Sequence, residues 1–210
     1  MNQENKKRIP ESTISRLNLY LREVTILNNL KIPRISSADL GERTNLSDAQ
    51  IRKDLNYFGS FGKTGSGYAV PELVKSLRKI LGRDESWSIA VIGAGSLGSA
   101  FMKYPGFNKE NLHLTAAFDN DPGKIGQAIN NIPIYDISQI REIIQKNKIA
   151  ICVITVPAQH SQAVADEAVA GGIKCLLNFA PVALTVPEDV IVRNVDLSGE
   201  LETLTYFLVH

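Results

Sequence analysis

Apolar residues recur at helical spacing near the start of the chain. They are Ile14, Leu17, Leu21, Val24 and Leu30. Because steps of three and four residues place side chains on one side of a helix, we expect a helix over about residues 12–30. It should end before Pro33, since proline lacks an N–H group and constrains the residue in front of it.

The next stretch predicts two short helices joined by a tight turn. Ser37 can cap the first helix, which should end near Arg43, and residues 44–46 form the turn. Ser47 can cap the second helix, and Gln50, three residues later, completes a capping box. This is the outline of a helix-turn-helix.

The second of these helices has an apolar face and a polar face. Ile51, Leu55 and Phe58 are spaced to point inward. The opposite face presents Arg52, Lys53 and Asn56, flanked by Gln50 and Tyr57. In a major groove, arginine and lysine pair with guanine, and asparagine and glutamine with adenine, so this face is expected to read DNA together with Ser47.

A glycine-rich segment follows. Glycines at positions 62, 65 and 67 surround Lys63, and Tyr68 comes next. Because glycine allows tight turns, we expect a two-stranded hairpin with a basic tip. A helix-turn-helix with such a hairpin is a winged helix, in which Lys63 would contact the minor groove or a phosphate and Tyr68 would support it. A helix with Pro71 in its first turn closes this region.

From residue 87 onward, apolar strands alternate with helices. The expected strands are residues 87–92, 112–118, 149–155 and 174–179, and the expected helices are residues 96–103, 138–147 and 159–170. Such alternation indicates an α/β fold with a doubly wound parallel sheet and helices on both faces. The predicted organisation is a winged-helix DNA-binding domain (1–83), a Rossmann-type domain (84–195) and a C-terminal helix (196–210).

The C-terminal helix carries an apolar stripe made of Leu197, Leu201, Leu204 and Leu208. The stripe could pack on the sheet of its own chain or on a partner chain.

Charge is divided unevenly between the two parts. Up to Arg83 the chain has 15 Lys and Arg against 8 Asp and Glu, and the remainder has 8 against 14. A basic front part could meet a polyanion, although basic solvated faces are common. No apolar run approaches the roughly 20 residues of a membrane span.

Cysteine usage points to a reducing, cytoplasmic compartment. Cys152 and Cys175 lie in apolar segments and lack the spacing of a metal site or a redox pair, so we expect two buried thiols and no bound metal.

The run Gly93-Ala94-Gly95-Ser96-Leu97-Gly98 follows an expected strand and opens an expected helix. In a dinucleotide site the first glycine permits the tight turn, the second lets the backbone approach the pyrophosphate, and the third lets the helix lie close to the strand. The pyrophosphate would bind at the helix N-terminus. A plain glycine-rich turn is the alternative.

Asp119 ends the second strand, 21 residues after Gly98. That is close to the spacing of the acid that binds the ribose. Its carboxylate would accept hydrogen bonds from a 2′-hydroxyl and repel a 2′-phosphate, so we expect NADH and NAD+ rather than their 2′-phosphorylated forms. Two strand-end loops, Thr155-Val156-Pro157 and residues 178–181 with Asn178 and Phe179, should face the same crevice.

A catalyst for hydride transfer is hard to find. His160 is the only histidine near a strand-end loop, and a solvated or capping role is the simpler interpretation. No separate substrate domain follows the dinucleotide fold, so the chain is not expected to be an enzyme.

Long motifs in both parts resemble the Rex family of redox-sensing transcriptional repressors. They are IPESTISRL (9–17), QIRKDLNYFGSFGKTGSGY (50–68), IGAGSLGSAF, AAFDNDPGKIG, TVPA, LNFAPV and NVDL. The resemblance covers nearly the whole chain. It implies a homodimer that binds a pseudo-palindromic operator when NADH is scarce and leaves it when NADH binds.

The same resemblance implies roles for three residues and for the last helix. Arg16 would pair with Asp196 of the other subunit in one state, and Tyr104 would reach the partner's nicotinamide site. The C-terminal helix would cross to the other subunit. Asp196 as a helix cap and Arg16 as an exposed helix charge remain the simpler alternatives. Two other functions also stay open: a small NAD-dependent dehydrogenase with a fused DNA-binding domain, and a regulator whose nucleotide fold only dimerises.

Overall fold

The computed structural model describes residues 9–59, 61, 67–107 and 111–210. They belong to two compact units, Met1–Glu85 and Ser86–His210, which are described in turn. The C-terminal helix, which the sequence interpretation treats as a region of its own, falls within the second unit.

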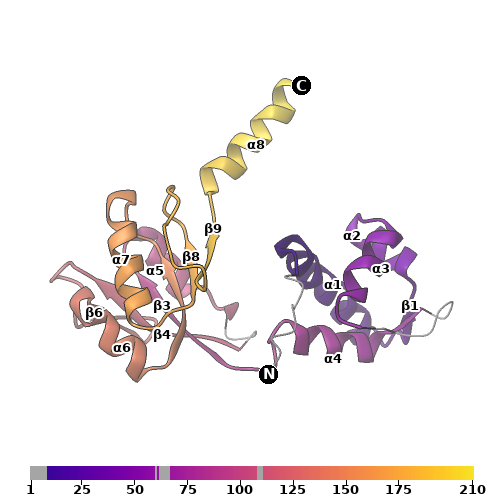
Figure 1. Cartoon of the computed structure of the whole chain (residues 1–210), viewed down its shortest axis with the longest axis horizontal. Coiled ribbons are helices and arrows are strands. Elements are labelled where there is room, and N and C mark those ends of the chain that lie inside the picture. The colour runs from indigo at the N-terminus through magenta and orange to yellow at the C-terminus, as the bar shows by residue number, and fades with distance from the viewer. Residues whose placement is uncertain (1–8, 60, 62–66, 108–110) are drawn as a thin grey trace. The chain divides into compact units, whose positions relative to one another are not determined.

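The first unit is helical, with one small sheet (Figure 1). Its elements are α1 (Glu11–Asn29), β1 (Arg34–Ile35), α2 (Ser37–Thr44), α3 (Asp48–Asn56), β2 (Tyr68–Ala69) and α4 (Val70–Ile80). Apolar side chains from all four helices meet in one core, which includes Leu17, Leu40, Leu55 and Leu77. Phe58 follows the end of α3 and packs on this core while half-buried.

The apolar face of α1 differs from the predicted stripe at its end. Leu30 is the C-cap residue and is 64% exposed, whereas Leu27 is buried. The helical spacing stops at Asn29, so Leu30 no longer shares the buried face. Tyr20 joins that face and is fully buried.

Helix capping in the helix-turn-helix departs from the prediction at two residues. Ser36, not Ser37, caps α2, and it forms a complete capping box with Asp39. Ser47 caps α3 as expected, with its hydroxyl accepting from the N–H of Gln50 at 3.2 Å. The Gln50 side chain, however, donates to Asp54 at 2.9 Å, so the expected capping box at α3 is wrong.

The strand after the glycine-rich segment pairs with β1, the strand that precedes the helix-turn-helix. β2 is antiparallel to β1, with Arg34 opposite Ala69 and Ile35 opposite Tyr68. The sequence interpretation treated residues 31–34 only as a helix break and therefore missed β1. The tip of the expected hairpin, including Lys63, lies outside the described residues.

The second unit contains a seven-stranded sheet in the order β5-β6-β4-β3-β7-β8-β9 (Figure 1). Its strands are β3 (Trp87–Ile92), β4 (Leu112–Asp119), β5 (Ala128–Ile129), β6 (Ile132–Asp136), β7 (Ile149–Ile154), β8 (Cys175–Asn178) and β9 (Ile191–Asn194). All neighbours are parallel except β5 and β6. The fold class is confirmed, and β3 lies at the point where the strand order reverses.

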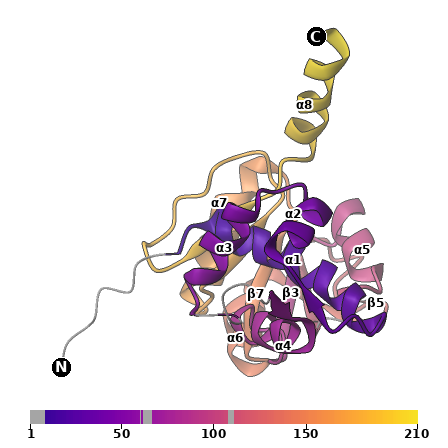
Figure 2. The same cartoon turned by 90° about the vertical axis from the view of Figure 1, so that its right-hand side faces the viewer.

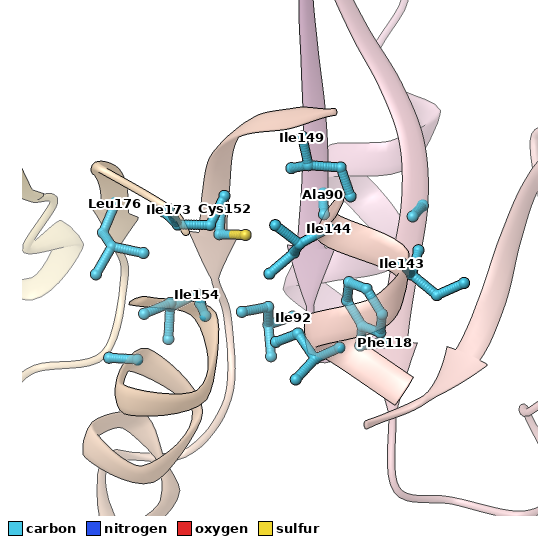
Figure 3. Packing of buried hydrophobic residues seen from close by; sticks show 14 of the residues in the cluster. Ala90, Ile92, Phe118, Ile143, Ile144, Ile149, Cys152, Ile154, Ile173 and Leu176 are labelled. Atoms are coloured by element: carbon cyan, nitrogen blue, oxygen red, sulfur yellow. The ribbon is translucent and has the colours of Figure 1, made fainter. Parts of the chain in front are cut away.

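Helices cover the two faces of the sheet. They are α5 (Ser96–Lys103), α6 (Ile140–Lys146), preceded by a 3-10 turn at Ile137–Gln139, and α7 (Ala158–Ala170). Alternate residues of β3 point to opposite faces: Ile92 packs with α6 and α7, and Val91 packs with Met102 of α5. Figure 3 shows the first of these cores, with Ile92 and Phe118 beside Ile143 and Ile144 of α6.

The sequence did not predict three strands of this sheet. β6 contains Pro133, and a proline indicates a break in a strand; its partner β5 has only two residues. β9 is an edge strand whose Ile191 is 40% exposed, so it lacks the apolar run of a buried strand.

The two thiols differ in their surroundings. Cys152 is fully buried, and burial raises the pKa of its thiol to about 12. Cys175 is exposed, so the expectation of two buried cysteines is wrong for this residue. Cys175 is the first residue of β8, where it pairs with Ile191 of the edge strand β9.

The last helix, α8 (Leu197–Val209), has no buried residue. In both views it extends from the end of β9 (Figures 1 and 2). The leucines of its predicted stripe are all more than half exposed, so the stripe does not pack on the sheet of this chain. None of the helices in the described part of the chain combines the length and apolar character of a membrane crossing.

Candidate functional site

The glycine loop between β3 and α5 is shaped by three different constraints. Gly93 has a φ of +100°, and a Cβ there would lie 2.9 Å from Cγ1 of Val156. A Cβ on Gly98 would lie 1.9 Å from the carbonyl oxygen of Gly93. A Cβ on Gly95 would meet nothing within 4 Å. The first and third glycines therefore close the turn, and the second leaves open space at the N-terminus of α5.

A cavity of about 500 Å³ lies at this loop, at the C-terminal ends of β3, β4 and β7. Six residues from the predicted cofactor set line it: Gly93, Gly95, Asp119, Thr155, Val156 and Pro157. Its remaining lining residues are Ile92, Phe118, Asn120, Lys124, Ile137, His160, Ala163, Val164 and Glu167. Ligands of open α/β sheets bind at this edge, where the strand order reverses.

Asp119 is the last residue of β4, and hydrogen bonds fix its carboxylate in place. It is 8% exposed, and its carboxylate accepts hydrogen bonds from the N–H groups of Ala94 at 2.8 Å and Asp121 at 2.9 Å, and from Nζ of Lys124 at 3.1 Å. Burial acts to raise the pKa of Asp119, but these hydrogen bonds outweigh it and lower the pKa. The group is therefore ionised at neutral pH.

Thr155 binds the loop directly. Its hydroxyl donates to the carbonyl oxygens of Gly93 at 2.8 Å and Ile92 at 3.0 Å. The side chain thus fastens the end of β7 to the glycine turn. Because its hydroxyl donates to the protein backbone, Thr155 forms part of the cavity wall and does not offer this donor to a ligand.

The loop after β8 is organised by the fully buried Asn178. Its Nδ2 donates to Ala180 O, Val182 O and Oδ1 of Asn194, and its Oδ1 accepts from the N–H of Ala180. The amide is used within the loop, so Asn178 shapes the backbone there. Phe179 packs edge-on against Phe101 of α5, with ring centroids 6.1 Å apart.

Four other predicted residues, Ser96, Leu97, Tyr104 and Asp196, do not line the cavity. Ser96 and Leu97 are exposed in the first turn of α5. Tyr104 is the C-cap of α5, is 59% exposed, and makes an edge contact with Phe107. Asp196 caps α8 by accepting from the N–H groups of Ser198 and Gly199.

Four polar residues that line the cavity, Asn120, Lys124, His160 and Glu167, were not in the predicted set. Lys124 follows Asp119 by five residues, and this short separation was the signal in the sequence that the two side chains could meet. His160 was interpreted as a solvated residue at a helix start; it is exposed, but it also lines the cavity. No group of three or more metal-ligating side chains occurs within the described residues.

The polar face of α3 is presented to solvent in the first unit. Lys53, Asn56 and Tyr57 are exposed. Arg52 forms an ion pair with Asp48 at 2.5 Å and donates to the hydroxyl of Ser37 at 3.1 Å. Both contacts use Nη1, so the other N–H donors of this half-exposed guanidinium are not engaged by Asp48 or Ser37.

A buried carboxylate behind this face joins α3 to α1. Asp54 is fully buried, and it accepts two hydrogen bonds from Arg16, at 2.5 and 2.7 Å. It also accepts from the hydroxyls of Tyr20 at 2.7 Å and Thr13 at 3.2 Å, and from Gln50 at 2.9 Å. Burial acts to raise the pKa of Asp54, but the hydrogen bonds from Arg16, Tyr20 and Gln50 lower it overall.

This network gives Arg16 and Gln50 a structural partner that the sequence interpretation missed. Arg16 is not a free helix charge, because Asp54 of its own unit binds its guanidinium. Gln50 is half-buried and directed at the same carboxylate. Asp54 was overlooked because it directly follows Arg52 and Lys53, so it resembles one more charge on a solvated helix face.

Two family models match the chain. One is described as a CoA binding domain and matches residues 84–182, and the other is described as a putative DNA-binding protein N-terminus and matches residues 8–56. The two matches fall in the second and first units respectively.

Relatives match both units together. A protein of Chloroflexus aurantiacus named "Redox-sensing transcriptional repressor Rex" is 46% identical over 199 residues, which are 95% of this chain and 94% of that protein. A crystal structure of RSP in complex with β-NAD+ and operator DNA is 40% identical with a TM-score of 0.91, covering 95% of this chain and 92% of that one. A structure of RSP in complex with β-NADH is 39% identical with a TM-score of 0.86, covering 96% and 95%.

Proposed function

This chain belongs to the Rex family of redox-sensing transcriptional repressors, and we propose that it binds operator DNA at a low NADH/NAD+ ratio and is released by NADH. As a member of a family of repressors it is a regulator and not an enzyme. It acts on DNA, so we place its action in the cytoplasm.

The observation that carries the proposal is the shape of the glycine loop. Gly98 has no room for a side chain, whereas Gly95 faces open space at the N-terminus of α5. Backbone N–H groups at a helix N-terminus favour an anion, so this space suits a pyrophosphate. Gly93, Ala94, Gly95, Ser96, Leu97 and Gly98 would form the cradle, and Asp119 would accept from a ribose hydroxyl.

The rest of the dinucleotide would extend along the strand ends. Thr155, Val156 and Pro157 would border it, and the Asn178–Phe179 loop would approach its nicotinamide half. When bound, the dinucleotide supplies a ring whose charge differs between its two redox states. An apolar pocket favours the uncharged reduced ring, because burying an unpaired charge is costly.

The first unit would bind DNA through the polar face of α3. Arg52, Lys53, Asn56 and Tyr57 would face the major groove, and Ser47 would contact the backbone near the helix start. Gln50 would reach a base only after leaving the carboxylate of Asp54. Lys63 of the predicted hairpin would contact the minor groove or a phosphate, and Tyr68, which packs on the core, would support it. A homodimer would then read a pseudo-palindromic site, because the symmetry of the protein and of the operator match.

The experiment that tests the function is operator binding across a range of NADH/NAD+ ratios. A duplex selected by the protein from a random-sequence library serves as the probe. A ligand shifts a two-state equilibrium only by its difference in affinity for the two states, so NADH must weaken operator binding more than NAD+ does. Equal operator affinity in saturating NADH and in saturating NAD+ would refute the proposal.

Lys53→Ala is expected to weaken binding to that duplex on the order of tenfold, because one phosphate or base contact is lost. If the contact is to a phosphate, the slope of log K against log salt falls by about one. Lys79→Ala removes the same charge from the exposed side of α4 and should change neither quantity. Equal effects of the two variants would point to net charge rather than to a contact at α3.

Asp196→Asn tests the proposed pairing of Arg16 with Asp196 of the other subunit. Asparagine is a good N-cap, so α8 should keep its cap while the negative charge disappears. We expect operator binding in the absence of NADH to persist and its response to NADH to fall severalfold. Arg16→Ala is a poorer test, because it also removes the partner of Asp54. An unchanged response to NADH in Asp196→Asn would exclude the ion-pair role.

The rival function is a small NAD-dependent dehydrogenase with a fused DNA-binding domain. Steady oxidation of NADH with a simple carbonyl substrate would support it. His160, which lines the cavity, is the residue to replace in that case. A regulator whose nucleotide fold only dimerises would instead show no NADH binding in a fluorescence titration.

A further inference from the structure

The guanidinium of Arg52 is fastened on one side to two other residues of the helix-turn-helix. Its Nη1 donates to Oδ2 of Asp48, four residues earlier on α3, at 2.5 Å, and to the hydroxyl of Ser37, the first residue of α2, at 3.1 Å. These two bonds use both N–H groups of Nη1. The Arg52 side chain is 53% exposed, so it is held in place at the surface of the first unit.

The remaining donors of Arg52 form a fork. Nε has one N–H and Nη2 has two, and none of them bonds to a residue that the structure describes. Nε–H and one N–H of Nη2 lie in parallel along one edge of the planar group, the same edge by which Arg16 binds Asp54. A ligand with two neighbouring acceptors can therefore bind Arg52 without displacing Asp48 or Ser37.

The charge of Asp48 decides which acceptors suit this fork. Its carboxylate compensates the charge of Arg52 at 2.5 Å and would repel a phosphate that approached the same guanidinium. A neutral pair of acceptors carries no net charge for Asp48 to repel. In the major groove, O6 and N7 of guanine are such a pair, and an arginine fork binds them with two hydrogen bonds.

Lys53, at the next position of α3, shows the contrast. It is exposed, and its ammonium has no ion pair or hydrogen bond within the described part of the chain. A flexible ammonium acts as a point charge without a fixed direction, which suits a phosphate. The two neighbouring cations of α3 are therefore prepared for different acceptors.

We propose that Asp48 and Ser37 are positioning residues that hold Arg52 in place to read one guanine in each half of the operator. The inference rests on the proposed binding of operator DNA through α3, and it assigns the base and the residues that select it. An arginine side chain loses rotamer freedom when it binds, and Asp48 and Ser37 restrict Arg52 before DNA arrives. Discrimination in favour of guanine is then larger than an arginine without these partners would give.

The test combines protein variants with a modified base. The probe is a duplex that the full chain selects from a random-sequence library in the absence of NADH. Replacing each of its guanines in turn by 7-deazaguanine removes the N7 acceptor and leaves the base pair intact. In the wild type, one position in each half-site should weaken binding about tenfold, and the same replacement should weaken binding of Arg52→Ala by less than about twofold.

Asp48→Asn and Ser37→Ala each remove one hydrogen-bond partner of Arg52 in its ionised or hydroxyl form. In both variants the effect of 7-deazaguanine at that position should shrink to about threefold or less, whereas Ser37→Thr keeps the hydroxyl and should behave as the wild type. Asp48→Asn also removes a negative charge near the phosphates, so its binding to a random duplex should hold or strengthen while discrimination falls. Damage to the fold would instead weaken binding to both duplexes.

Glu72→Gln is the matched control. It removes one exposed negative charge from the first turn of α4, and it should leave the effect of 7-deazaguanine unchanged. An effect that is equally large in the wild type, Asp48→Asn and Ser37→Ala overturns the positioning role. A wild type with no guanine whose effect depends on Arg52 overturns the assignment of the base. If the wild type selects no duplex at all, the proposed function fails together with this inference.

Discussion

Replacing Asp54 with alanine is expected to lower the free energy of unfolding of the first unit by about 3 kcal/mol. The variant leaves the buried hydroxyl of Tyr20 without its acceptor and releases the guanidinium of Arg16 from a two-bond ion pair. Hydrogen exchange of the α1 and α3 amides measures the effect, since these amides report the stability of this unit alone. Their exchange should become roughly 150-fold faster.

Asp48→Asn is the control for this prediction. Asp48 lies on the same helix and pairs with Arg52, but both side chains are about half exposed, so the loss should stay below about 1 kcal/mol. Similar losses for the two variants would mean that the buried network adds nothing beyond a surface ion pair.

The dependence of stability on pH follows from the same carboxylate. The pKa of Asp54 is lower in the folded chain, so its contribution is complete above its ordinary pKa of about 3.9. It is lost as the pH falls through the lowered value. The wild type should therefore lose stability steeply between about pH 5 and the acid limit, and Asp54→Ala should show a flatter acid limb.

Replacing Gly98 with alanine should lower stability, whereas replacing Gly95 with alanine should lower NADH affinity. Gly98→Ala places a methyl group 1.9 Å from a backbone oxygen, so the second unit should lose about 3 kcal/mol of unfolding free energy. Gly95→Ala adds a methyl group in open space at a φ of −76°, which alanine adopts easily, so stability should stay within about 0.5 kcal/mol. That methyl group occupies the proposed position of the pyrophosphate, and NADH affinity should fall on the order of 100-fold.

Urea unfolding followed by the fluorescence of Trp87 measures the stability of both variants, because this only tryptophan lies in β3 of the second unit. NADH titration of Gly95→Ala measures the affinity. A folded Gly95→Ala variant with unchanged NADH affinity would show that the loop carries no pyrophosphate.

Local patterns were sufficient for the main elements of the fold. The alternation of apolar strands and helices gave β3 and α5 at their observed ends, because a buried strand and a glycine turn leave plain marks in the sequence. Ser47 was identified as a cap because capping depends on neighbours within three residues. β1 and β9 were missed because a two-residue strand and an exposed edge strand are defined by their partners, not by their own composition.

The sequence by itself determined the two-part organisation, the glycine loop, the position of Asp119 and the polar face of α3. Each depends on spacing along the chain. Only the tertiary structure decided that Arg16 of α1 binds the carboxylate of Asp54, 38 residues away on α3. A buried charge takes the donors that the fold brings within about 3 Å, and a donor from another helix cannot be inferred from spacing along the chain.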